Sequence, residues 1–254
     1  MQRADRIFSW LDRAFGIALA AALAGAALSA MPTGVRAESV KASGAVVSEA
    51  RSVSAEFDAI SVSGGIDLHV RQGAQQAVEA KAHANLLPYL ETVVEGKTLM
   101  VRWKRGSQLR LHQSPTVDVT AVKLQSIASA GSSDVSIGAL KTPQLVLAVS
   151  GSGDVNLESL AAEELTVKIA GSGNVKAGGG QVGKLQIKVS GSGDVQTEGL
   201  KADDVSISIA GSGDAKVHAD KTLAVSIAGT GDVVYRGEAQ VKSTVAGSGS
   251  VRKR

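Results

Sequence analysis

Residues 145–157 read LVLAVSGSGDVNL, and this stretch decides the fold. Leu145, Leu147 and Val149 alternate with other residues before the glycines, and the alternation resumes at Val155 after them. Period-two alternation with β-branched residues is typical of half-buried strands. The Gly-Ser-Gly between the two apolar series favours a tight turn. The stretch therefore predicts a strand, a turn and a second strand.

The phrase around these glycines recurs seven times, as AGSSDV, SGSGDV, AGSGNV, SGSGDV, AGSGDA, AGTGDV and AGSGSV. Its first glycines are Gly131, Gly151, Gly171, Gly191, Gly211, Gly229 and Gly247. The first four spacings are 20 residues and the last two are 18. Such a regular period indicates a repeat architecture, in which each unit packs on the next.

Stacking explains why one unit needs its neighbours, because a single strand pair buries too little apolar surface to be stable. Units about 4.8 Å apart would align the apolar residues into ladders, and each fully buried aliphatic side chain contributes roughly 1.5–3 kcal/mol. The sequence thus predicts an all-β parallel β-helix (β-solenoid) with repeats of about 20 residues. Right-handed crossovers are favoured in general, although the sequence leaves the handedness open. A Greek-key sandwich gives no reason for the period, and alternation excludes helical repeats.

The turn phrase defines the predicted structural residues. Gly-Ser-Gly permits positive φ at two places, small residues let adjacent coils approach closely, and the following Asp or Asn can accept hydrogen bonds from local backbone amides. The predicted turn residues are Gly151, Gly153, Asp154, Gly171, Gly173, Asn174, Gly191, Gly193, Asp194, Gly211, Gly213, Asp214, Gly229, Gly231 and Asp232.

The acidic residues of these turns should form a column along one edge of the stack. Carboxylates one coil apart would repel by roughly 1 kcal/mol in water, which a divalent cation could relieve. Calcium-binding β-rolls, however, carry Gly-x-Gly-x-Asp in a nonapeptide period, whereas here Asp follows the second glycine directly. We therefore predict a turn-stabilising role, with calcium binding as the alternative.

The first 37 residues have the order of a signal peptide. Arg3, Arg6 and Arg13 precede an apolar run over residues 15–30, and Val35-Arg36-Ala37 resembles a small-residue cleavage site. The alternative is an uncleaved anchor helix, although the apolar run is short for a membrane span. We expect export to the periplasm or the cell surface, with no transmembrane segment after cleavage.

The remaining chain is predicted to be one domain. Residues 38–55 are polar and small, which predicts a flexible lead-in, and residues 56–254 form the solenoid. Within it, residues 56–106 are an irregular first part that begins the stack and caps it, and residues 107–254 are regular repeats. In the first part, strands on either side of Glu95-Gly96-Lys97 predict a hairpin, and Pro88 limits a helical turn.

The composition excludes several kinds of chemistry. The chain of 254 residues has no cysteine, which excludes thiolate sites, and its four histidines leave little room for a histidine-rich metal site. His69, His83, His112 and His218 lie far apart and are interpreted as surface residues. Gly-Ser-Gly is followed by strands, not by the helix that a phosphate loop requires. No cofactor is expected, and a leader-free chain of nearly neutral charge argues against a nucleic-acid partner.

One small basic cluster surrounds Trp103 and could meet an anionic glycan or lipid. Its cations are Arg102, Lys104, Arg105 and Arg110. A solvated strand edge protected by charge is the preferred interpretation.

The order FDAISVSGGIDLHVRQG, HANLLPYLETVVEGKTLMVRW and repeated SGSGDV resembles a known bacterial family, the "putative auto-transporter adhesin head, GIN domain" family. The resemblance covers about residues 56–237. It implies a secreted or envelope-associated β-helical domain without an established enzymatic activity.

These observations together predict an exported, non-catalytic adhesin-like or structural module of the bacterial envelope. Its partner would be an envelope protein or a polysaccharide, with self-association as a further option. The alternative functions are a β-helical polysaccharide lyase or hydrolase, and a calcium-binding solenoid. With 3% aromatic residues, the chain offers few side chains for stacking on sugars.

Overall fold

A computed structural model of the chain describes residues 39–254, apart from Ser54 and His112. The predicted signal peptide, residues 1–37, lies outside the described residues. The fold below is that of the compact unit Glu38–Arg254. No helix in the described part is long and apolar enough to cross a membrane.

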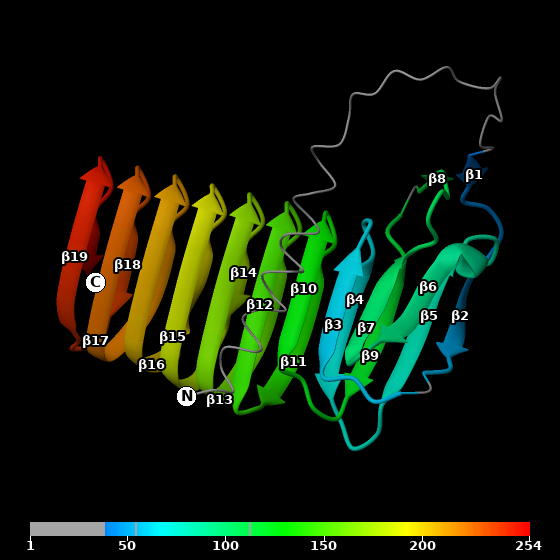
Figure 1. Cartoon of the computed structure of the whole chain (residues 1–254), viewed down its shortest axis with the longest axis horizontal. Coiled ribbons are helices and arrows are strands. Elements are labelled where there is room, and N and C mark those ends of the chain that lie inside the picture. Colours follow the sequence, from blue (N-terminus) through cyan, green and yellow to red (C-terminus); the bar gives the residue numbers. More distant parts are fainter. Residues whose placement is uncertain (1–38, 54, 112) are drawn as a thin grey trace. The chain divides into compact units, whose positions relative to one another are not determined.

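The chain is built almost entirely from strands (Figure 1). The N-terminal elements are β1 (Val40–Lys41), β2 (Val46–Arg51), β3 (Ala59–Ser63), β4 (Asp67–Gln72), β5 (Ala77–His83), the 3-10 helix η1 (Leu87–Tyr89), β6 (Leu90–Glu95), β7 (Thr98–Trp103), β8 (Leu109–Arg110) and β9 (Thr116–Ala121). The later strands are β10 (Ser126–Gly131), β11 (Val135–Lys141), β12 (Gln144–Gly151), β13 (Val155–Gly171), β14 (Val175–Ala177), β15 (Gly180–Gly191), β16 (Val195–Gly211), β17 (Ala215–Gly229), β18 (Val233–Arg236), β19 (Gln240–Gly247) and β20 (Val251–Lys253).

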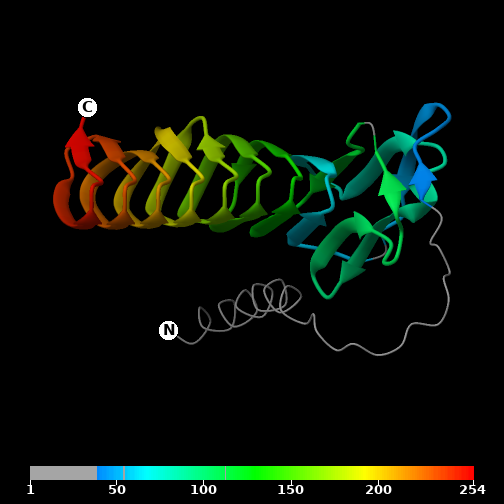
Figure 2. The same ribbon diagram turned by 90° about the horizontal axis from the view of Figure 1, so that it is seen from above.

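From β10 onward every strand pairs in parallel with the strand one repeat away, and this confirms the predicted parallel β-helix. Leu165 pairs with Leu185, and Leu185 pairs with Val205, so each coil lies directly over the preceding one. The last coils are shorter, and Val205 pairs with Leu223. Figure 2 shows the coils as successive loops around one axis. Right-handed winding stays a prediction.

The interior of the coils is a set of aliphatic ladders. Every predicted ladder residue is buried: Leu145, Leu147, Val149, Val155, Leu157, Leu165, Val167, Ile169, Val175, Ala177, Leu185, Ile187, Val189, Val195, Val205, Ile207, Ile209, Leu223, Val225 and Ile227. A further buried ladder was not predicted, in which Leu140 pairs with Leu160. Another joins Val182 to Ala202. Both are offset by three residues from the alternating series, Leu160 from Leu157 and Val182 from Leu185, so simple alternation does not reveal them.

The first part of the chain, called the cap below, pairs with the first regular coil of the solenoid. β3 and β4 pair in parallel with β10 and β11 of the first regular coil. β6 and β7 form the predicted antiparallel hairpin around Gly96, and η1 is a single short turn that contains Pro88. β9 pairs with β4 and also antiparallel with β5. The regular repeats therefore begin at Ser126, later than the predicted residue 107.

The prediction of a flexible lead-in was wrong for much of residues 38–55. β2 runs antiparallel along β5, with Val46 opposite His83 and Arg51 opposite Val78. β1 pairs in parallel with β8. β2 is almost entirely exposed, so backbone hydrogen bonds hold it in place without a buried face. A strand of this kind cannot be predicted from a segment of small and polar residues, because it has no buried apolar face.

Candidate functional site

The Asp and Asn residues that follow the glycines form a continuous ladder along the stack. In this Asx ladder (Asp134, Asp154, Asn174, Asp194, Asp214 and Asp232), each Oδ1 accepts the backbone N–H of the equivalent residue one coil later. The Asp154 N–H donates to Asp134 Oδ1 at 2.8 Å, for example. The prediction of hydrogen bonds to local amides was therefore wrong, because the donor lies 20 residues away. The ladder joins coils as well as shaping turns.

Two members of the column also donate a side-chain hydrogen bond to the residue below. Asn174 Nδ2 donates to Asp154 Oδ1 at 3.0 Å, and Ser250 Oγ donates to Asp232 Oδ1 at 2.8 Å. The hydroxyl and the amide of Ser250 lower the pKa of the Asp232 carboxyl below its ordinary value. Neutral side chains in the column therefore supply donors that carboxylates lack.

The two glycines of each turn have different roles. The first has positive φ, for example +134° at Gly171 and +131° at Gly191, where side chains are strained. The second has no positive φ, so the prediction of two such places was wrong. A Cβ on either glycine would collide with a carbonyl oxygen of the coil below, that of Gly151 for Gly171 and that of Gly153 for Gly173. The predicted close stacking at the corner is confirmed.

The column of second glycines begins with a serine. Ser133 occupies that position in the first regular coil and is completely buried. Its Oγ accepts the N–H of Ile66 at 3.1 Å, and its carbonyl accepts Ser129 Oγ at 2.8 Å. The hydroxyl therefore satisfies a backbone donor of the cap where the regular stacking starts.

The Asx ladder offers little for a metal ion. Every Oδ1 in it already accepts a backbone amide, and in the described part of the chain no three His, Asp or Glu side chains converge as a metal site would require. Asp67 lies in the cap, one coil before Asp134, because the residues that follow them, Leu68 and Val135, are paired. Burial raises the pKa of the Asp67 carboxyl, and the charge of Asp134 adds to the rise, although an Asp134 amide opposes it.

A second row of side chains lies on the outer face of the strands that follow the turns. This polar row is His69, Ser136, Asn156, Lys176, Gln196 and Lys216. The strand register places each one directly above the last, and all are exposed or half-buried. Sequence reasoning missed the row, although each member from Ser136 onward occupies the second position after the Asx residue.

Two shallow grooves run along this face. One has a volume of about 560 Å³ and extends from His69 across Gly138 and Asn156 to Gly178. The other, of about 240 Å³, lies between the polar row and the Asx ladder. Both are lined by Asn156 and Lys176. The side chain of neither residue hydrogen-bonds within the described structure, so the grooves present free polar groups.

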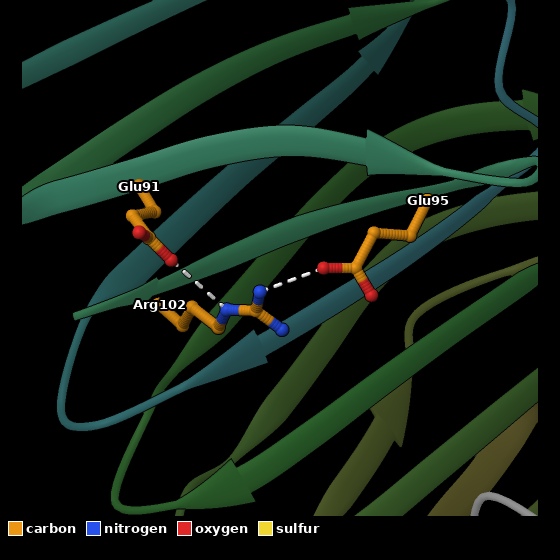
Figure 3. Close-up of polar contacts among 3 residues, drawn as sticks. All are labelled: Glu91, Glu95 and Arg102. Atoms are coloured by element: carbon orange, nitrogen blue, oxygen red, sulfur yellow. Dashed lines mark hydrogen bonds and ion pairs between the residues drawn. The ribbon is translucent and has the colours of Figure 1, made fainter. Parts of the chain in front are cut away.

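Two residues of the predicted basic cluster, Arg102 and Trp103, have partners within the cap. Arg102 Nε lies 3.2 Å from Glu91 Oε2 and its Nη2 lies 2.6 Å from Glu95 Oε1 (Figure 3), which raises the pKa of the guanidinium. Trp103 Nε1 donates to the Gly64 carbonyl at 2.8 Å, so the indole covers the turn before β4. Arg102 and Trp103 are thus engaged in holding the cap together.

The histidines lie on separate strands. His69 Nδ1 contacts Asp118 at 3.2 Å, His83 Nδ1 contacts the Gly44 carbonyl at 2.8 Å, and His218 Nε2 contacts Asp220 at 3.0 Å. The side chain of His112 lies outside the described residues. These three contacts are local pairings and do not form a shared site.

A parallel β-solenoid with polar outer faces and an irregular cap is the class of protein that these features define. The chain belongs to the family described as "Putative auto-transporter adhesin, head GIN domain", whose model matches residues 56–239. Comparison with curated proteins gave no match.

Several solved structures share this fold. A "putative adhesin" from Bacteroides fragilis has a TM-score of 0.80 at 22% identity, over 85% of this chain and 100% of that one. A "putative lipid binding protein" from Parabacteroides distasonis has a TM-score of 0.72 at 23% identity, with the same coverage of 85% and 100%. A "putative adhesin" from the same species has a TM-score of 0.69 at 25% identity, again over 85% and 100%.

Proposed function

We propose that the chain is an exported, non-catalytic adhesin-like module that binds an extended component of the bacterial envelope along its outer face. The observation that carries the proposal is the polar row, in which Asn156 and Lys176 line both grooves with unpaired side chains. A row with one hydrogen-bonding group per coil suits a polymer that repeats along its length. Membership of an adhesin-head family supports this function.

The hydrogen bonds of the acidic residues in the Asx ladder support a non-catalytic role. General acid–base hydrolysis of a glycan needs two carboxyl groups placed on either side of a bond. The carboxylates of the Asx ladder each hold the next coil through a backbone amide, at 2.8 Å for Asp214 and Asp232. Moving them toward a substrate would break the hydrogen bonds that join the coils.

Among envelope polymers, we propose a polysaccharide as the ligand. Hydroxyl groups both donate and accept hydrogen bonds, which matches the amides of Asn156 and Gln196 and the ammonium group of Lys176. The groove of about 240 Å³ brings these three side chains together. The shallow, polar grooves predict weak binding at each coil that adds up over several coils.

Co-sedimentation with insoluble peptidoglycan sacculi and with immobilised capsular polysaccharide tests the proposal. We expect the parent to bind one of these probes, and the triple variant Asn156→Ala, Lys176→Ala and Gln196→Ala to lose at least tenfold in affinity. The control is Lys188→Ala, Ser190→Ala and Ser208→Ala on the outer face of the strands before the turns. Equal binding by both variants, or no binding by the parent, would refute the proposed surface.

A further inference from the structure

Four cations of the cap lie on β1, on β8 and in the turn that precedes β8. This basic tip consists of Lys41, Lys104, Arg105 and Arg110, and all four side chains are exposed. The short parallel pair β1–β8 places Lys41 beside Arg110, and the Ala42 N–H donates to the Arg110 carbonyl at 3.1 Å. Figure 1 shows β1 and β8 side by side at the edge of the cap.

A turn after β7 supplies the other two cations. The Lys104 N–H donates to the Tyr89 carbonyl at 2.8 Å, which fixes the start of the turn against η1. The Ser107 N–H then donates to the Lys104 carbonyl at 3.2 Å and closes it around Arg105. The backbone therefore holds the cations of the tip in place, although their side chains face solvent.

Three other basic residues of the cap have acidic partners, whereas Arg71 and Lys81, like the tip, have none among the described residues. The tip is therefore distinguished by the grouping of its charges. Arg51 lies 3.3 Å from Glu49, Lys97 lies 3.9 Å from Asp58, and Arg102 pairs with two glutamates. The four cations of the tip have no acidic partner within the described residues. A group of unpaired cations attracts an anionic surface.

The sequence indicates which anionic surface lies within reach. The apolar run of the leader ends at Ala30, ten Cα-to-Cα steps before Val40 at the start of β1. A fully extended chain of that length spans at most about 35 Å. Until the leader is cleaved, an apolar run that is engaged with the membrane therefore keeps the basic tip close to that membrane, where the folded cap can first meet its headgroups.

We propose that the basic tip docks the cap on the anionic phospholipid headgroups of the membrane through which the chain is exported. Basic clusters beside a membrane-engaged segment bind anionic lipid in this way, with each Lys or Arg worth about fivefold in binding. The tip would orient the solenoid with its regular coils directed away from the membrane. The polar row and the basic tip would then bind different partners, a polysaccharide and anionic lipid.

Vesicle co-sedimentation of the exported protein tests the proposal. The probes are vesicles of phosphatidylglycerol mixed with phosphatidylcholine, and vesicles of phosphatidylcholine alone. The test variant is Lys104→Gln, Arg105→Gln and Arg110→Gln. The control is Lys188→Gln, Lys201→Gln and Lys242→Gln in the regular coils, which removes the same charge. Circular dichroism and the melting midpoint confirm that both variants keep the fold.

We expect the parent to prefer the anionic vesicles, the test variant to lose on the order of a hundredfold in partitioning, and the control to change little. Binding should weaken as salt rises, because exposed charges are screened. Equal losses in the two variants would show that net charge alone acts, and no preference of the parent for anionic vesicles would also overturn the proposal. Equally tip-dependent binding to dextran sulfate would show that the tip recognises anionic polymers in general.

Discussion

Asp154 and Asn174 are joined by two hydrogen bonds to the same oxygen. Asp154 Oδ1 accepts the backbone N–H of Asn174 at 2.9 Å and its side-chain Nδ2 at 3.0 Å. Asn174 Oδ1 in turn accepts the Asp194 N–H at 2.9 Å. The asparagine therefore continues the ladder in both directions and separates two carboxylates of the column.

Replacing Asn174 with Asp should destabilise the fold by roughly 1 kcal/mol, because it removes the Nδ2 donor and places three carboxylates in adjacent coils. Chemical denaturation of the parent and the variant measures the difference. Asn156→Asp makes the same charge change on the exposed polar row and serves as the control. If both variants lost the same stability, the position in the column would not matter.

Replacing Gly173 with Ala should cost about 2–4 kcal/mol, since the new Cβ collides with the Gly153 carbonyl and forces the coils apart. Ser172→Ala at the exposed neighbouring position should cost less than about 1 kcal/mol. Denaturation midpoints of the two variants provide the comparison. A Gly173→Ala variant as stable as Ser172→Ala would contradict the close stacking at this corner.

The pH dependence of stability should carry opposite contributions from Asp232 and Asp67. The lowered pKa of Asp232 gives a contribution that is complete above the ordinary carboxyl pKa and is lost as pH falls through the folded value. The raised pKa of Asp67 gives a contribution to stability that is present below the ordinary carboxyl pKa and is lost as pH rises through the pKa of Asp67 in the folded protein.

Urea denaturation at pH values from 3 to 7, in steps of roughly one pH unit, tests the two directions of this pH dependence. Asp232→Asn should weaken the loss of stability toward acid, and Asp67→Asn should remove a loss toward neutral pH. If Asp232→Asn steepened the acid loss, or Asp67→Asn left the profile unchanged, the stated causes of the two shifts would be wrong.

Export should remove the leader, so the mature protein should begin at or near Glu38. The physical reason is the order of basic residues, short apolar run and small residues in the first 37 positions. Intact-mass measurement of the exported protein checks this, and fractionation with added protease distinguishes periplasm from cell surface. Exported protein that retains Met1 would favour the anchor helix instead.

Much of the fold could be predicted because the same pattern of alternating apolar residues recurs in each repeat. Alternation at Leu165, Val167 and Ile169 recurs one coil later, and register follows from the period. The cap could not be read so well, because β2 is ordered by backbone pairing without a buried face. The partners of the Asx hydrogen bonds could not be predicted either. A donor 20 residues away in the sequence comes close to the Asx oxygen only when the coils stack.

The Asx ladder leads to a final prediction about Asp154, Asp194 and Asp214. Asn in their place keeps the Oδ1 acceptor for the next coil, and Asn174 shows that the Nδ2 group can donate to the oxygen below. The triple variant also removes repulsion between carboxylates, about 1 kcal/mol per close pair in water. It should therefore be as stable as the parent or slightly more stable in thermal denaturation.

A calcium role would give the opposite result, because Asn is a weaker ligand than a carboxylate and the variant would lose the ion. Thermal denaturation with and without a chelator separates the two cases. If the carboxylates serve only the backbone, chelator leaves the melting temperature of parent and variant unchanged. A drop of several degrees in the parent alone would show that the ladder holds a cation, and the backbone amides would then share Oδ1 with it.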